Sequence, residues 1–153
     1  MAQNTTRNDV ENRLKDMFVR LMKDSQNIVE FSGNTRRIST ARKAQSEGYY
    51  VDCEMRNELP PYPQYGGTIS IMAETRADSS GNFEGDHDRS VVERMIGQVR
   101  ELIGQTGIVS KINRYDRRIV IHADGLKEAD CYSEDTGSIR RQVIDFEVHC
   151  YAP

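Results

Sequence analysis

The chain has 153 residues, of which 37% are hydrophobic and 29% charged, and its formal net charge is −3. These values favour one folded domain over residues 1–153 and exclude the composition of a disordered chain. The negative charge argues against general affinity for nucleic acid, and no apolar run approaches the roughly 18 residues of a membrane span. Because the N-terminus lacks the apolar core of a signal peptide, we expect a soluble protein made in a cytosol.

Helical periodicity defines the first predicted element. Apolar residues recur at helical spacing from Val10 to Met22, and charged residues occupy the rest of the surface. Thr6 and Asp9 provide a capping box at its start. The basic segment that follows, at about residues 32–46, is expected to be mostly loop.

Two strands are predicted next. Residues 49–56 and 68–75 both alternate between apolar and polar side chains, which is typical of strands with one buried face. Pro60, Pro61 and Pro63 lie between them and are incompatible with regular ladder pairing. We therefore expect a hairpin with a long, proline-stiffened loop.

A second helix is predicted over residues 91–103, where seven apolar residues recur at steps of three and four. Asp86 or Asp88 can cap its start. Gly97 lies in its middle, and we expect this glycine to permit a close approach to the sheet. Residues 108–112 are predicted to form a short extended piece.

The chain ends with two further predicted strands. Residues 118–123 form the third strand, and residues 124–137 are expected to be a polar connection. The last strand, 139–151, alternates strictly from Ile144 onward. Its apolar side comprises Ile144, Phe146, Val148 and Cys150, and its polar side comprises Asp145, Glu147, His149 and Tyr151.

The predicted order is α-β-β-α-β-β. Each helix has one apolar stripe and each strand one apolar face, so the simplest arrangement is an α+β fold. In it, both helices pack on one face of a mainly antiparallel four-stranded sheet. The opposite face of the sheet is then polar and available for contacts.

Candidate metal sites are weak. The acidic loop from Asp78 to Asp88 lacks the glycine and glutamate that an EF-hand calcium loop requires, so a solvated loop is favoured. His87 lies between two aspartates, but adjacent side chains do not easily converge on one ligand. If the last two strands pair, His122 and His149 become cross-strand neighbours, yet two histidines are an incomplete zinc set.

Catalytic chemistry is also weakly supported. Asp52 and Glu54 on the first strand, with Asp145 and Glu147 on the last, resemble paired catalytic carboxylates, but a polar sheet face explains them better. No phosphate-binding glycine loop, nucleophile elbow or metalloprotease motif is present. We therefore expect no enzyme activity and no cofactor or metal. The three cysteines have no paired spacing and are expected to be small apolar fillers rather than disulfide or zinc ligands.

Four pairs of basic residues stand out in an acidic chain. Solvated charge and complementary subunit contacts explain them equally well. Together with the polar side of the last strand and its hydrogen-bonding edge, they are our candidate subunit interface. Its residues are Arg36, Arg37, Arg42, Lys43, Arg117, Arg118, Arg140, Arg141, Asp145, Glu147, His149 and Tyr151.

The order of elements resembles that of tail terminator and tail-completion proteins of long-tailed bacteriophages. The resemblance runs from about Asn8 to Ala152. It rests on a leading helix, a hairpin with the link Leu59–Pro63, a polar loop at 81–88 before an amphipathic helix, and a final strand that begins at Arg140. In that family the final strand corresponds to the closing edge of the sheet. The basic segment 32–45 is longer than the pattern requires.

The resemblance implies a structural virion protein. Such proteins form a ring, commonly of six copies, that caps the tail tube, ends its polymerisation and joins the tail to the head-side connector. The implied partners are further copies of the chain, the tail tube protein and a head-completion protein, with neither membrane nor specific nucleic acid. The implied location is the virion neck, after synthesis in the host bacterial cytoplasm. Alternatives are another neck connector, a baseplate adaptor, a small hydrolase or a ligand-binding module.

Overall fold

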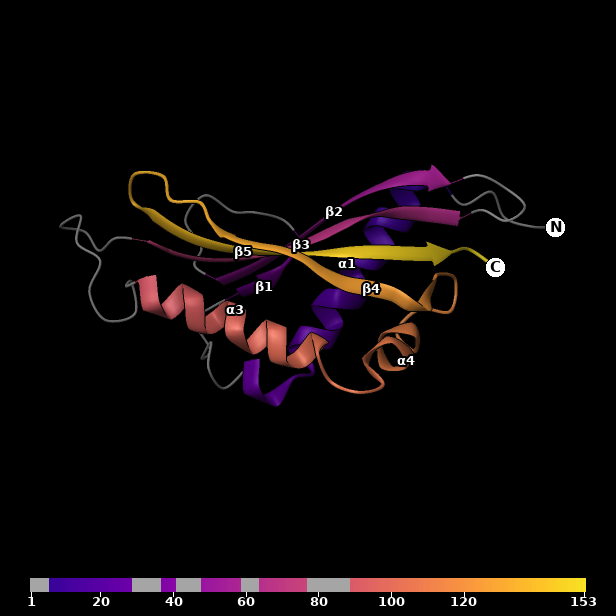
Figure 1. Ribbon diagram of the computed structural model, residues 1–153, viewed down its shortest axis with the longest axis horizontal. Coiled ribbons are helices and arrows are strands. Elements are labelled where there is room, and N and C mark those ends of the chain that lie inside the picture. The colour runs from indigo at the N-terminus through magenta and orange to yellow at the C-terminus, as the bar shows by residue number, and fades with distance from the viewer. Residues whose placement is uncertain (1–5, 29–36, 41–47, 59–63, 77–88) are drawn as a thin grey trace.

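The computed structural model describes residues 6–28, 37–40, 48–58, 64–76 and 89–153 (Figure 1). For Arg37 and Glu58 only the backbone is described. Residues 29–36, 41–47, 59–63 and 77–88 lie outside these ranges, and with them the predictions for the proline-rich link, for the acidic segment and for Asp86, His87 and Asp88. The elements are α1 (Arg7–Lys23), β1 (Arg37–Ser39), β2 (Gly48–Glu58), β3 (Gln64–Arg76), α3 (Arg89–Ile103), α4 (Ile108–Asn113), β4 (Val120–Ser133) and β5 (Ile139–Tyr151).

The strands form one sheet in the order β1-β2-β3-β5-β4. β1 pairs with β2 in parallel, and all other pairs are antiparallel. The predicted α+β class, the mainly antiparallel sheet and the pairing of β2 with β3 are confirmed. The sheet has five strands rather than four, because residues 37–39 of the expected basic loop join its edge.

The described helices cover one face of the sheet (Figure 1). α1 packs against β2, α3 against β3 and β5, and α4 against β4. The seven apolar residues predicted for the second helix are all buried in α3. They meet the apolar side of β5, where Ile144, Phe146, Val148 and Cys150 are also buried. No described helix lies on the opposite face of the sheet.

The prediction for the closing strand was wrong in one respect. β5 lies between β3 and β4, and both of its hydrogen-bonding edges are paired over most of its length. β4 takes the outer position because it runs to Ser133, through residues expected to be a polar connection. Register shifts between Ile121 and Leu126 and between Glu128 and Asp130 interrupt its alternation and conceal it in the sequence.

Residues 108–112 form a helix and not the predicted extended piece. Gly107 adopts a left-handed conformation, with φ of 78°, at the start of α4. Ile108 and Ile112, four residues apart, are both buried against the core. A run of five residues is too short for its periodicity to separate helix from strand.

Two local predictions have clear outcomes. The capping box is confirmed, since the Asp9 backbone N–H donates to Thr6 Oγ1 at 3.2 Å and the Thr6 N–H donates to Asp9 Oδ2 at 3.2 Å. The expected role of Gly97 is wrong, because a methyl group at that position would meet no atom within 4 Å. No helix in the described part of the chain is long and apolar enough to cross a membrane.

Candidate functional site

The side of the sheet opposite the described helices presents two neighbouring rows of charged side chains. Next to these rows the same side is buried at Tyr50, Val143 and Glu74, so the expected polar face extends over only part of the sheet. In the first row Asp52 lies opposite Ser70, and Asp145 lies between Ser70 and Asp130. In the second row Glu54 lies opposite Thr68, and Glu147 lies between Thr68 and Lys127. We call the two rows the acidic face, which comprises Asp52, Glu54, Thr68, Ser70, Lys127, Asp130, Asp145 and Glu147.

The acidic face is accessible and holds five carboxylates against one lysine. Asp145 is half-buried and accepts a hydrogen bond of 2.6 Å from Ser70 Oγ. Asp130 is exposed and lies directly opposite Asp145 in the ladder. Like charges at directly opposite positions destabilise a sheet, by an amount of the order of 0.2–1 kcal/mol. This chain therefore carries an unfavourable pair where a neutral residue would stabilise the isolated fold.

Glu147 and His149 form a surface pair at the end of the face. His149 Nε2 lies 2.8 Å from Glu147 Oε1. This hydrogen bond, with the charge of the histidine, lowers the pKa of Glu147 below its ordinary value, and Lys127 and Arg56 act in the same direction. Both side chains remain in contact with solvent, so the pair leaves the face accessible.

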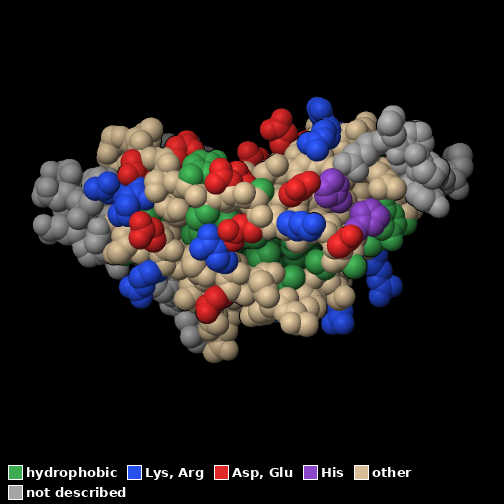
Figure 2. Space-filling model, viewed as in Figure 1, with side chains coloured by type: hydrophobic (Ala, Val, Ile, Leu, Met, Phe, Trp, Pro, Cys, Tyr) green, Lys and Arg blue, Asp and Glu red, His purple; other side chains and the backbone are tan. Residues whose placement is uncertain are grey.

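The two described histidines lie close together without forming a metal site. Figure 2 shows their side chains, in purple, near the end of the sheet where the chain terminates. Gly125 lies between them, since a methyl group there would approach the His149 carbonyl oxygen at 2.5 Å and His122 Cβ at 3.1 Å. The His122 ring contacts the Tyr151 ring at 5.0 Å between centroids. In the described ranges no three His, Cys, Asp or Glu residues are placed to hold a metal ion.

Side chains block the outward edge of β2, beyond its short pairing with β1, and the outward edge of β4. On β2, the Cys53 N–H donates to Asp52 Oδ1 at 2.9 Å and the Met55 N–H donates to Glu11 Oε2 of α1 at 2.7 Å. β4 shows the same arrangement. Its Cys131 N–H donates to Asp130 Oδ1 at 2.8 Å, and the Asn113 amide exchanges two hydrogen bonds with the Ile121 backbone, of 2.9 and 3.0 Å. Such capping disfavours the addition of a further strand.

Arg141, an expected interface residue, is used inside the subunit. It is 5% exposed, and its Nε donates to Oε1 of the fully buried Glu74 at 2.6 Å. Its Nη1 donates to Glu134 Oε1 at 2.8 Å. This network joins β5 to β3 and to the end of β4, so Arg141 has a structural role that the sequence did not indicate.

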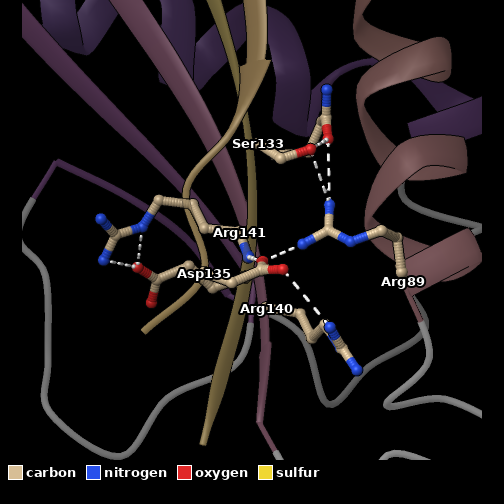
Figure 3. Close-up of polar contacts among 7 residues, drawn as sticks. Arg89, Ser133, Asp135, Arg140 and Arg141 are labelled. Carbon is tan, nitrogen blue, oxygen red and sulfur yellow. Dashed lines mark hydrogen bonds and ion pairs between the residues drawn. The ribbon is translucent and has the colours of Figure 1, made fainter. Parts of the chain in front are cut away.

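Asp135, at the turn between β4 and β5, contacts the neighbouring arginines (Figure 3). It forms ion pairs with Arg89, the first residue of α3, and with Arg140 at 3.3 Å. It also accepts the Arg141 backbone N–H at 3.2 Å. Arg140 is thus engaged within the chain as well, and the hairpin is tied to the start of α3.

The remaining basic candidates divide into two groups. Arg117 and Arg118 are exposed in the segment between α4 and β4. Arg36, Arg42 and Lys43, with the side chain of Arg37, lie outside the described residues. On the acidic side, Asp145, Glu147, His149 and Tyr151 share the uncovered face, as predicted. Sequence reasoning missed Ser70, Lys127 and Asp130, whose places depend on the register of β3 and β4.

A shallow hollow of about 500 Å³ lies between α4 and β4. None of the residues that line it is ionisable, and Asn113 within it is already bonded to β4. The cysteines behave as fillers: all three are free thiols, Cys53 and Cys150 are buried, and burial raises the pKa of the Cys53 thiol. Neither feature competes with the acidic face as a candidate site.

Comparison with protein families and with curated protein sequences identified no relative of this chain. A function for this protein must therefore be argued from the fold and from the geometry of the acidic face.

Proposed function

We propose that this chain is a structural subunit of a phage virion that acts as the tail terminator. In this role copies of the chain form a ring, commonly six-membered, that caps the tail tube, ends its growth and joins it to the head-side connector. The proposal rests first on the resemblance in the order of elements. Its partners are further copies of the chain, the tube protein and a head-completion protein.

The acidic face is the observation that supports this proposal best. It is a broad charged surface on a regular sheet, and five of its eight residues are exposed carboxylates or their exposed lysine neighbour, namely Asp52, Glu54, Lys127, Asp130 and Glu147. An exposed charged face of this kind suits contact with another protein rather than enclosure of a small molecule, because ligand pockets are concave and mostly apolar.

Electron microscopy of the purified chain, alone and with tail tubes, tests the proposal. We expect rings in negative stain and one ring at a single end of each tube, with tube growth stopped where a ring is bound. Binding along the tube wall, or at another position in the neck, would favour a connector or adaptor instead. A chain that stays monomeric and never binds tubes would refute the proposal.

A further inference from the structure

We propose that the acidic face of one copy binds a basic corner of a second copy, in a head-to-tail contact. The basic corner comprises the four exposed cations of α4 and the segment that follows it, Lys111, Arg114, Arg117 and Arg118. This inference deepens the proposed function and rests on it in one respect, since it takes the partner to be another copy of the chain. It names the two surfaces that meet.

The basic corner stands out because its four cations have one carboxylate within their segment, Asp116, which interacts electrostatically with both Arg13 and Arg118. Arg13 forms an ion pair with Asp116 at 2.8 Å, and Arg20 forms one with Asp16 at 3.0 Å. By contrast, none of the four corner cations forms an ion pair with any described carboxylate. The corner is thus a concentrated positive surface in a chain whose net charge is −3.

The acidic face carries the opposite charge, with an excess of carboxylates over cations. Its five carboxylates exceed the charge of Lys127 and of Arg56 at its margin, and Asp130 and Asp145 repel each other across the ladder. A cation from a partner would offset that repulsion. Electrostatic complementarity of this kind sets the register of an interface and accelerates association.

The two surfaces lie on opposite sides of the sheet. α4 belongs to the helix layer, where Ile108 and Ile112 pack into the core, and the acidic face lies on the uncovered side (Figure 1). One copy can therefore use both surfaces at once. Such a heterologous contact closes into a ring or continues as an open chain, depending on the rotation between neighbours.

Association by strand addition is disfavoured by the same structure. The outward N–H groups of Cys53, Met55, Ile121 and Cys131 already have side-chain acceptors. Pairing through either edge would first have to break these bonds. Contacts through Glu54, Glu147 and the corner leave those bonds in place.

Two charge-reversal variants of the full chain test the contact. Glu54→Lys with Glu147→Lys cancels the net charge of the acidic face, which then holds three carboxylates and three lysines, without touching the edge caps. Arg117→Glu with Arg118→Glu cancels the net charge of the four corner positions, and Glu93→Lys with Glu101→Lys, two exposed residues of α3, is the matched control. Circular dichroism and thermal unfolding verify that each variant folds, and sedimentation velocity measures association at low salt and at about 1 M salt, where the Debye length is about 3 Å.

We expect the wild type and the α3 control to associate at low salt and to dissociate at high salt. Each double variant alone should associate at least ~100-fold more weakly, because one of the two surfaces has lost its net charge and with it the attraction to the other. An equimolar mixture of the two should associate again, since the corner of one matches the face of the other. A mixture that stays monomeric, a reversed variant that associates like the wild type, or a wild type that is monomeric at low salt would each overturn the inference.

The inferred contact and the proposed function can each fail without the other. Rings that form on tail tubes from both reversed variants would reject the contact and leave the tail terminator proposal standing. Charge-dependent association in solution, without any binding to tubes, would keep the contact and reject the terminator.

Discussion

Removing one partner of the buried Arg141–Glu74 ion pair should destabilise the fold strongly. Glu74 is 0% exposed and Arg141 5% exposed, and their closest hydrogen bond is 2.6 Å. In Arg141→Met the buried carboxylate loses this cation, which costs about 3–5 kcal/mol when such a pair is broken. For a domain of this size each kcal/mol moves the melting temperature by about 2–4 °C, so we expect a loss of roughly 6–20 °C.

Thermal and urea unfolding, followed by circular dichroism, measure the effect. The double variant Glu74→Leu with Arg141→Met should be more stable than Arg141→Met, because it replaces both charges by apolar groups. Arg140→Met is the control, since that half-exposed arginine should contribute at most about 1 kcal/mol. The reasoning is refuted if Arg141→Met costs no more than Arg140→Met, or if the two substitutions at 74 and 141 are simply additive.

For three further substitutions the structure sets the sign of the expected change in stability or in pKa. Gly97→Ala should stabilise the protein by about 1 kcal/mol in urea unfolding, since the methyl group meets open space on a helix; an unchanged midpoint would contradict this. Gly67→Ala should destabilise it by about 1–3 kcal/mol in the same assay, because the new Cβ would collide with the Glu54 carbonyl oxygen. His149→Ala should raise the lowered pKa of Glu147 toward its ordinary value in an NMR titration. A lowered carboxyl pKa adds stability only above the unfolded value and loses it as pH falls through the folded value, so the two proteins should converge in stability at acid pH.

Helical periodicity and strand alternation predicted most of the elements. Apolar steps of three and four defined α3, which buries a single face, and strict alternation defined β5 from Ile144 onward, where only one of its faces is buried. β4 was predicted only in its first part, since its two register shifts break the alternation that marks a strand. α4 was missed because two buried isoleucines in a short helix leave no readable period.

The candidate site was predictable on one strand only. The polar side of β5 follows from alternation, which identified Asp145 and Glu147. The place of Asp130 opposite Asp145 depends on a register shift within β4, and strand order and register are set by tertiary packing. Arg141 shows the converse: two adjacent arginines predict solvated charge, whereas the register of β3 and β5 sets Arg141 directly opposite Glu74.

The position of β5 changes the kind of association that this chain can form. A terminal strand at a sheet edge would recruit a neighbour through backbone hydrogen bonds, which depend little on side-chain identity and on salt. Here β5 is an inner strand, and the outer N–H groups of Cys53 and Cys131 are occupied by the aspartates that precede them. The same aspartates contribute their charge to the acidic face. One residue type at each edge thus discourages strand addition and supplies a surface for charged partners, so association of this chain should weaken steeply with salt.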